Sequence, residues 1–180
     1  MRLSICAVLF TLFVTSHVVA QESGSRPKVE IKISVGASDF GTDNESYPHF
    51  VVGTATRIHI SRHWSIEPEF SYMRRSSNDQ DHVFQPNVVY EFHPQGVRVV
   101  PYLIGGVGVI RHKSVYHGSD FVTGAPVTFD TSYTTWSANA GAGLKVFLSK
   151  HLFVAPEARV GTQPTVRANI SIGYVFPVHD

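Results

Sequence analysis

Apolar and polar residues alternate at every second position along most of the chain after residue 21. In the first such segment, Val29, Ile31 and Ile33 are separated by charged or polar residues, and the segments 135–148 and 165–176 repeat the pattern. Four further segments show it less cleanly: 50–60, 65–74, 82–92 and 152–160. Because successive side chains on a β-strand point to opposite faces of a sheet, this period predicts strands, and no window has a convincing helical period.

An eighth segment, 98–111, is apolar on both faces and contains Gly105, Gly106 and Gly108, so the alternation does not decide its facing. With this segment the sequence predicts eight strands of about 9–13 residues. Soluble strands usually have about 5–6 residues, whereas barrel strands that cross a bilayer need about 9–11. The lengths therefore favour an all-β chain that forms an eight-stranded antiparallel up-and-down transmembrane β-barrel.

Long and short connections alternate between the predicted strands. Loops at 38–49, 75–81 and 113–133 alternate with short turns at 61–64, 93–96 and 149–150. Outer-membrane barrels have this arrangement, with long loops outside the cell and short turns in the periplasm. The final connection, 161–164, is short where the alternation predicts a long one.

The first twenty residues have the layout of a cleaved secretory signal peptide. A positively charged start precedes an almost unbroken apolar run over residues 3–14, and small or apolar residues lead to a predicted cleavage after Ala20. The apolar run is shorter than the roughly 20 residues that a membrane-spanning helix needs. We therefore expect a signal peptide at 1–20 and one barrel domain at 21–180.

Composition excludes several classes of protein. The only cysteine, Cys6, lies in the predicted signal peptide, so the mature chain has no disulfide and no thiolate metal site. Without Arg2 the remaining 14 basic side chains balance the 14 acidic ones, whereas a nucleic-acid-binding protein has a basic surplus. An exported, cysteine-free and neutral chain indicates a bacterial envelope protein with no nucleic-acid partner.

The two faces of the predicted sheet differ in charge. In a soluble barrel the apolar face lines the interior, whereas in a membrane barrel lipid contacts the apolar face and the polar face lines the interior. We predict the membrane arrangement, with a structural charge network of five acidic and five basic side chains inside the barrel: Glu30, Lys32, Arg57, Glu67, Glu69, Glu91, Lys145, Glu157, Arg159 and Arg167. Such a network can neutralise itself, which it must do because a buried unpaired charge is costly.

Aromatic residues stand near the ends of the apolar faces. They are Phe50, Tyr72, Phe84, Phe92, Tyr174 and Phe176. Core packing would explain them, but the export signal and the strand lengths favour two aromatic girdles at the bilayer interfaces. Because eight strands enclose a lumen just wide enough for side chains, we expect a filled interior and no general diffusion pore.

Three short segments and the last strand are typical of one family. The segments are Pro101–Val109 and Asn139–Leu144, which are rich in glycine, and Pro156–Arg159, which contains a proline–glutamate pair. Through them the chain resembles the small OmpA/OmpX-like outer-membrane β-barrels. The resemblance implies an up-and-down barrel with both termini in the periplasm, inserted into the bacterial cell outer membrane by the outer-membrane assembly machinery. Members often end on an aromatic residue, whereas here four residues follow Phe176.

Few residues are candidates for catalysis or metal binding. His63, His93 and His151 fall in the short turns, but no pair has the spacing of a metal site, so we expect no metal and no cofactor. His59 and Ser61 have the His-x-Ser spacing found in one group of lipid A-modifying barrels. A serine nucleophile also needs an oriented base and an oxyanion site, and the sequence indicates neither, so we expect no enzymatic activity.

The sequence therefore predicts a monomeric integral outer-membrane barrel, surrounded by outer-membrane lipid, with a structural or adhesion-like role. The loops 38–49 and 113–133 would bind any surface ligand. Two alternatives stay open. One is an exported soluble barrel of lipocalin type that binds an apolar ligand, and the other is a lipid A-modifying enzyme that depends on His59 or Ser61.

Overall fold

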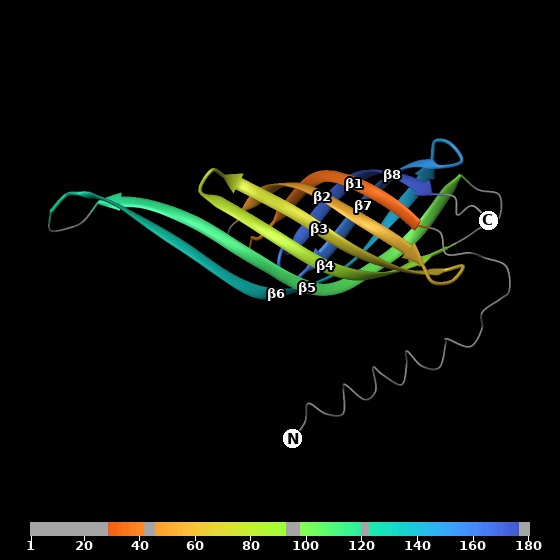
Figure 1. The fold of residues 1–180 in the computed structure, drawn as a ribbon, viewed down its shortest axis with the longest axis horizontal. Coiled ribbons are helices and arrows are strands. Elements are labelled where there is room, and N and C mark those ends of the chain that lie inside the picture. Colours follow the sequence, from red (N-terminus) through yellow and green to blue (C-terminus); the bar gives the residue numbers. More distant parts are fainter. Residues whose placement is uncertain (1–28, 42–45, 93–97, 120–122, 177–180) are drawn as a thin grey trace, which may run out of the picture.

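The computed structural model describes residues 29–41, 46–92, 98–119 and 123–176. Within these residues, eight antiparallel strands form one closed barrel (Figure 1): β1 (Val29–Asp39), β2 (Pro48–His59), β3 (Trp64–Ser76), β4 (Asp79–Glu91), β5 (Val99–Ser119), β6 (Pro126–Phe147), β7 (Leu152–Gly161) and β8 (Val166–Phe176). Each strand pairs with its neighbours in the sequence, and β1 pairs with β8 to close the ring. The predicted all-β up-and-down barrel is confirmed, whereas the predicted signal peptide lies outside the described residues.

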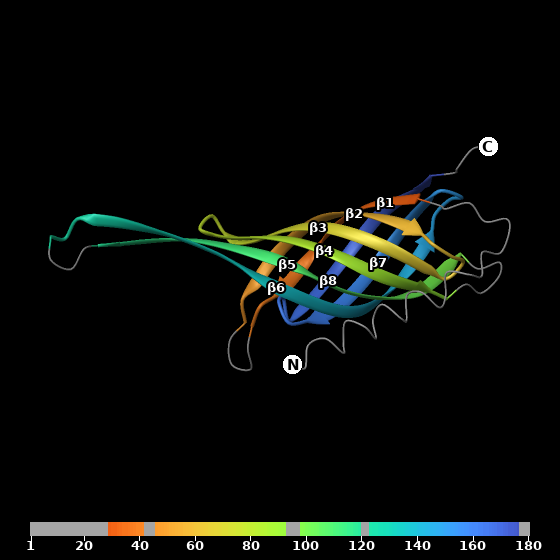
Figure 2. The same ribbon diagram turned by 60° about the horizontal axis from the view of Figure 1, so that its bottom comes forward.

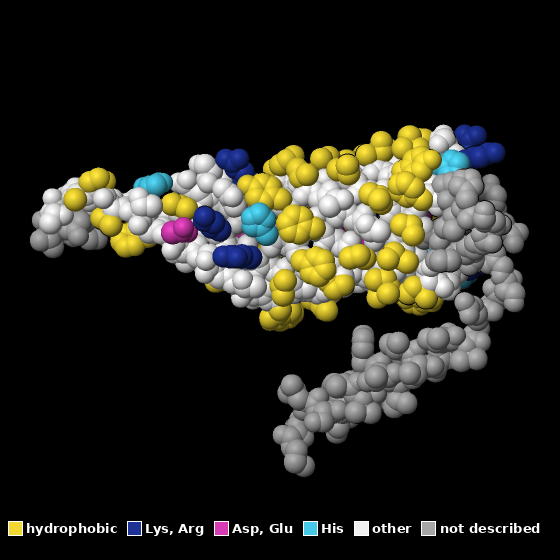
Figure 3. Space-filling model, in the orientation of Figure 1, with side chains coloured by type: hydrophobic (Ala, Val, Ile, Leu, Met, Phe, Trp, Pro, Cys, Tyr) yellow, Lys and Arg dark blue, Asp and Glu magenta, His cyan; other side chains and the backbone are white. Residues whose placement is uncertain are grey.

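The alternation in the sequence becomes the division between the inside and the outside of the barrel. Along β1, Glu30 and Lys32 are buried inside, while Ile31 and Ile33 are exposed on the outer wall. Hydrophobic side chains cover much of the barrel wall that is visible in Figure 3. This is the reverse of a soluble barrel, and it is stable only where lipid covers the wall. No helix among the described residues is long and apolar enough to cross a membrane.

The structure settles the facing of β5, which is apolar on both sides. Tyr102 and Ile104 are buried inside the barrel, and Leu103 and Val107 are exposed on the outer wall. Gly143 on β6 makes room for the inward tyrosine, because a Cβ at this position would collide with the Tyr102 ring. One face of β5 is thus apolar because it packs inside the lumen, and the other because it lies on the wall.

Strands β5 and β6 continue beyond the barrel as a two-stranded ribbon (Figures 1 and 2). They contain 21 and 22 residues and stay paired as far as Ser119 and Pro126. The predicted loop at 113–133 is therefore wrong, because most of it is β-structure. The ribbon is exposed on both faces and so has no apolar face to give a clean alternation, although its Thr, Tyr and Val residues have high β-propensity.

We name the two ends of the barrel after their connections. The loop end carries the connections β1–β2, β3–β4, β5–β6 and β7–β8, and the turn end carries the other three. At the loop end, the Asp39 carboxylate accepts the N–H groups of Gly41 at 2.8 Å and Tyr47 at 2.7 Å, which holds the β1–β2 loop. The predicted loop at 75–81 is shorter than expected, since β3 ends at Ser76 and β4 begins at Asp79.

Outward aromatic side chains lie near both ends of the barrel. At the turn end, Trp64 packs edge-on against Tyr90 with ring centroids 4.9 Å apart, and Tyr90 packs against Phe92 at 5.0 Å. Towards the loop end, Phe50 and Trp136 are exposed on the outer wall. Two such bands are the arrangement expected where a barrel meets the two bilayer interfaces.

Apolar clusters share the lumen with the charged side chains. One contains Val89, Tyr102, Ile104, Phe153 and Ala155. The other lies towards the loop end and contains Val51, Met73, Val83 and Ile110, with Phe40 packed against it. The sequence predicts the polar part of this filling, but the buried aromatic rings come from positions that alternation alone does not assign.

Candidate functional site

The charged side chains inside the barrel form a connected network of ion pairs. The structure places all ten residues of the predicted charge network in the lumen, where each is buried: Glu30, Lys32, Arg57, Glu67, Glu69, Glu91, Lys145, Glu157, Arg159 and Arg167. Glu67 lies near the middle, with its carboxylate 2.6 Å from Arg57 Nε and 2.7 Å from Lys32 Nζ. Five acids and five bases cancel, so the lumen holds these charges without a net excess.

The network continues from Glu67 towards the loop end. Arg159 Nη2 lies 2.7 Å from both Glu69 Oε2 and Glu157 Oε1, and Arg167 Nη2 lies 2.5 Å from Glu69 Oε1. The Tyr102 hydroxyl donates to Glu157 Oε2 at 2.9 Å. Every carboxylate of the network therefore has a cationic partner, as groups taken out of water require.

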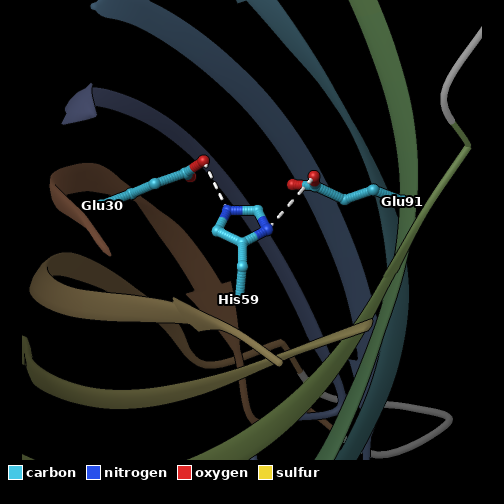
Figure 4. A group of neighbouring side chains, drawn as sticks. All are labelled: Glu30, His59 and Glu91. Atoms are coloured by element: carbon cyan, nitrogen blue, oxygen red, sulfur yellow. Dashed lines mark hydrogen bonds and ion pairs between the residues drawn. The ribbon is translucent and has the colours of Figure 1, made fainter. Parts of the chain in front are cut away.

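Near the turn end, Glu30, Arg57, His59, Glu91 and Lys145 form a group that we name the inner cluster. His59 points between the two carboxylates (Figure 4), with Nε2 2.8 Å from Glu30 Oε1 and Nδ1 3.9 Å from Glu91 Oε2. Lys145 Nζ lies 2.8 Å from Glu30 and 2.5 Å from Glu91, and Arg57 Nη1 lies 2.6 Å from Glu91. The two carboxylates and the imidazole could bind a metal ion, but Lys145 and Arg57 already neutralise the two carboxylates.

The candidate His-x-Ser pair is divided between two environments. His59 lies inside the barrel, where Nε2 contacts Glu30 and Nδ1 lies 3.0 Å from the Ser65 hydroxyl. Ser61 belongs to the β2–β3 turn, and its hydroxyl accepts the Trp64 N–H at 3.2 Å. The two side chains thus have separate partners: the serine that His59 contacts is Ser65, and the geometry does not pair His59 with Ser61.

A second histidine–carboxylate group lies inside the loop end. We name His49, Asp79, Asp81 and His112 the mouth cluster. His49 Nε2 is 3.4 Å from Asp81 Oδ2 and 3.6 Å from Asp79 Oδ2, and His112 Nδ1 is 2.5 Å from Asp81 Oδ1. Within the part of the chain that the structure describes, the groups of three or more potential metal ligands fall in the inner and mouth clusters.

Three residues of the mouth cluster lie one position beyond the predicted strands. The second predicted strand begins at residue 50, the fourth begins at 82 and the fifth ends at 111. His49, Asp81 and His112 are the next residues outward, and each continues the inward-facing register of its strand. Extending the polar alternation by one position would have identified all three.

The two turn histidines that the structure describes each stack on a tyrosine of the outer wall. His63 stacks on Tyr90 with ring centroids 5.7 Å apart, and His151 stacks on Tyr174 at 5.6 Å. His93 lies outside the described residues. The two described turn histidines are therefore polar partners of the aromatic band at the turn end.

Comparisons with known proteins agree with this architecture. The model of the family described as outer membrane protein beta-barrel domain matches residues 6–177. The N-terminal β-barrel domain of Pseudomonas aeruginosa OprF is similar in structure, with a TM-score of 0.58 and 18% sequence identity, covering 84% of this chain and 100% of that chain. A comparison with curated protein sequences gives no match.

Two further solved structures share the fold. Neisserial surface protein A (NspA) has a TM-score of 0.58 and 14% identity, covering 86% of this chain and 98% of that chain. Ail, the attachment invasion locus protein of Yersinia pestis, has a TM-score of 0.56 and 17% identity, covering 84% and 100%.

These identities are too low to carry more than the fold, but the family match spans nearly the whole chain. The apolar outer wall, the two aromatic bands and the long strands agree with a location in the bacterial outer membrane. On this evidence the chain belongs to the outer membrane protein beta-barrel domain family.

Proposed function

We propose that this chain is a non-enzymatic outer-membrane protein that contacts an external surface through the β5–β6 ribbon. The observation that carries the proposal is the length of the ribbon beyond the other strands (Figures 1 and 2). On the neighbouring hairpin, β3 ends at Ser76 and β4 begins at Asp79, and Asp79 pairs with Ser114 of β5. The pairing of β5 with β6 continues past Ser114 to Ser119. Closing the barrel does not require this extension.

The chemistry of the ribbon supports a contact surface. Tyr116 and Phe129 face each other across the two strands and are 63% and 60% exposed. Aromatic side chains bury a large area at a small cost in conformational entropy, which is why they are enriched at binding surfaces. On a segment outside the lipid-facing wall, the stability of the barrel does not account for their exposure.

The filled lumen and the divided His59–Ser61 pair support the rest of the proposal. Buried ion pairs and aromatic rings occupy the barrel interior, so a ligand is more readily bound outside it. The Ser61 hydroxyl is hydrogen-bonded within the β2–β3 turn, and His59 is hydrogen-bonded to Glu30. We therefore expect Ser61→Ala to leave the lipid A mass spectrum of the host unchanged, and a Ser61-dependent mass change would contradict the non-enzymatic part.

A cell-attachment assay tests the ribbon directly. Two variants are displayed in a host that lacks this protein: one in which a two-residue Asn-Gly turn replaces residues 114–131, and the double variant Tyr116→Ser/Phe129→Ser. The surfaces are coated with extracellular matrix proteins or with heparin. Heparin is included because a structure of Ail, which has the same fold, is described as a complex with a heparin analogue.

We expect the native chain to increase attachment to at least one surface, and both variants to lose most of that increase. A change in gel mobility on heating verifies that each barrel is folded in the membrane. Attachment that is equal for the native and shortened chains would reject the ribbon as the contact element. No increase with the native chain on any surface would reject the adhesive role.

A further inference from the structure

In the mouth cluster, the hydrogen bonds of His49 leave a lone pair facing two carboxylates. His49 Nδ1 lies 2.8 Å from the backbone oxygen of Tyr47, and because a carbonyl oxygen can only accept, Nδ1 carries the proton. Nε2 of the neutral ring is then an acceptor. It faces Oδ2 of Asp79 at 3.6 Å and Oδ2 of Asp81 at 3.4 Å, which are acceptors as well.

His112 approaches the same carboxylate from the other side. Its Nε2 lies 3.2 Å from the side-chain oxygen of Gln163, which accepts, so Nε2 donates. Its Nδ1 lies 2.5 Å from Asp81 Oδ1. Two acceptor atoms cannot lie 2.5 Å apart without a hydrogen between them, so His112 Nδ1 also carries a proton and His112 balances one of the two carboxylates. His49 Nε2 and the Oδ2 atoms of Asp79 and Asp81 remain acceptors that face one another with no hydrogen between them, and this group needs a further cation.

Asp81 shows most clearly that the mouth cluster needs a cation. Its side chain is fully buried, and among the described residues Oδ2, the oxygen that faces His49, has no hydrogen-bond partner. Among the described residues, the ion pairs of Asp79 and Asp81 are with His49 and His112, and none is with lysine or arginine. A buried carboxylate oxygen without a donor is unfavourable unless a cation lies beside it.

The spacing of the ligand atoms fits a small metal ion. In a tetrahedral zinc site with metal–ligand bonds of about 2.0–2.2 Å, neighbouring ligand atoms are about 3.3–3.6 Å apart. The distances of 3.4 and 3.6 Å from His49 Nε2 fall at these values, and all three ligand atoms lie within 4.8 Å of one another. An imidazole nitrogen with two carboxylates is a donor set that suits Zn²⁺ better than Ca²⁺ or Mg²⁺.

We propose that the mouth cluster binds one divalent metal ion of the zinc class through His49 Nε2 and the carboxylates of Asp79 and Asp81. His112 holds the second oxygen of Asp81 and so orients that carboxylate towards the ion. Because β2 and β4 are separated by β3, the ion joins two strands that do not pair with each other. This site is independent of the ribbon and of the proposed contact function.

The surroundings of the cluster are suited to a structural ion. Phe40 packs against the rings of His49 and His112 with centroids 4.6 and 5.7 Å away, and it also contacts the apolar cluster below them. Asp79 is partly exposed, with a third of its side chain accessible, so an ion can enter from the loop side. The ion fixes the start of β2 and thereby the β1–β2 loop.

Metal titration of the full barrel, folded in detergent without a polyhistidine tag, tests the proposal. Zn²⁺ binding is followed by calorimetry, and Co²⁺ serves as a spectroscopic probe because four-coordinate Co²⁺ absorbs visible light intensely. We expect one ion per chain for the native protein. His59→Gln, which alters the inner cluster, is the matched control and should bind in the same way.

Variants of the mouth cluster give the decisive comparison. Asp81→Asn and His49→Gln should abolish the Co²⁺ absorption, and His112→Gln should weaken binding by about tenfold, as expected for a residue that orients a ligand. If Asp81→Asn does not give a heat-modifiable barrel, the more exposed Asp79→Asn replaces it. The proposal is wrong if the native protein binds no ion, if the Asp81 and Asp79 variants bind like the native protein, or if His59→Gln abolishes binding.

Discussion

The inner cluster and the mouth cluster contain the same kinds of side chain in the same lumen, but they are neutralised differently. In the inner cluster, Lys145 and Arg57 place cationic groups 2.5–2.8 Å from Glu30 and Glu91. In the mouth cluster, Asp81 faces only imidazole rings among the described residues. The chain thus supplies its own cation at the turn end, and at the loop end the cation has to come from protons or from solution.

The hydrogen bonds of the two clusters show the same difference. Glu30 has one oxygen without a partner, but its other oxygen contacts both Lys145 and His59. Among the described residues, Oδ2 of Asp81 has no hydrogen bond, and it faces the acceptor Nε2 of His49. From this contrast we infer that removing a cation destabilises the inner cluster, whereas adding one stabilises the mouth cluster.

The largest effect is expected from Lys145→Met. This change removes a cation from between Glu30 and Glu91 and leaves two buried carboxylates close together, which should lower the free energy of unfolding by about 3–5 kcal/mol. Urea unfolding in lipid vesicles, followed by tryptophan fluorescence, measures it. Adding Glu91→Gln to the variant should restore part of the loss, and a loss below about 1 kcal/mol would show that the inner cluster does not depend on its own cations.

Zn²⁺ should have the next largest effect on the free energy of unfolding, which it should raise, whereas Lys145→Met lowers it. At a free concentration of 100 times the dissociation constant, a ligand that binds only the folded chain raises the free energy of unfolding by about 2.7 kcal/mol. We expect this increase in the native protein and in His59→Gln, but not in Asp81→Asn, by the same urea measurement. An equal increase in all three proteins would place the ion outside the mouth cluster.

A smaller effect is expected from Ser65→Ala. The Ser65 hydroxyl is buried 3.0 Å from His59 Nδ1, and the loss of one buried hydrogen bond should lower the free energy of unfolding by about 1 kcal/mol. The equivalent partner of His49 is a backbone carbonyl, which no side-chain substitution removes. Ser61→Ala is the control on the exposed turn, and an equal loss in both variants would mean that Ser65 does not act through His59.

The smallest effect on stability is expected outside both clusters, on the ribbon. Tyr116→Ser alters an exposed residue and should change the free energy of unfolding by less than about 0.5 kcal/mol while reducing attachment. Parallel unfolding and attachment measurements separate the two effects. A large loss of stability would show that the ribbon supports the barrel, and the attachment result could then not be assigned to contact.

The sequence predicts the charged interior better than its connections. Glu67 and Arg159 alternate with apolar neighbours along β3 and β7, so period two places them on the polar face of the sheet. The export signal and the strand lengths then predict that this face lines the lumen. The pairing of Arg159 with Glu69, 90 residues away, is not contained in that pattern. It depends on which strands lie opposite each other across the lumen.

The misses have two separate physical causes. His49 and Asp81 lie near the starts of β2 and β4, and His112 lies where β5 leaves the barrel wall. Alternation weakens at these positions because the lipid-facing residues give way to polar ones, so the predicted strands end too early. The ribbon around Tyr116 and Phe129 lies outside the bilayer and packs against no other layer. It therefore lacks the single apolar face that predicts a strand, and its sequence predicts a loop.

The amino-acid sequence by itself determines the number of strands and, where apolar and polar residues alternate, the face that each residue occupies, because alternation is a local property of an extended backbone. It also determines that the interior charges balance. Only the tertiary structure decides which charges meet, because closure of β1 on β8 and the stagger between strands set the height of every side chain in the lumen. That stagger brings His49, Asp79 and Asp81 together at the mouth, and it places Lys145 between Glu30 and Glu91 at the other end.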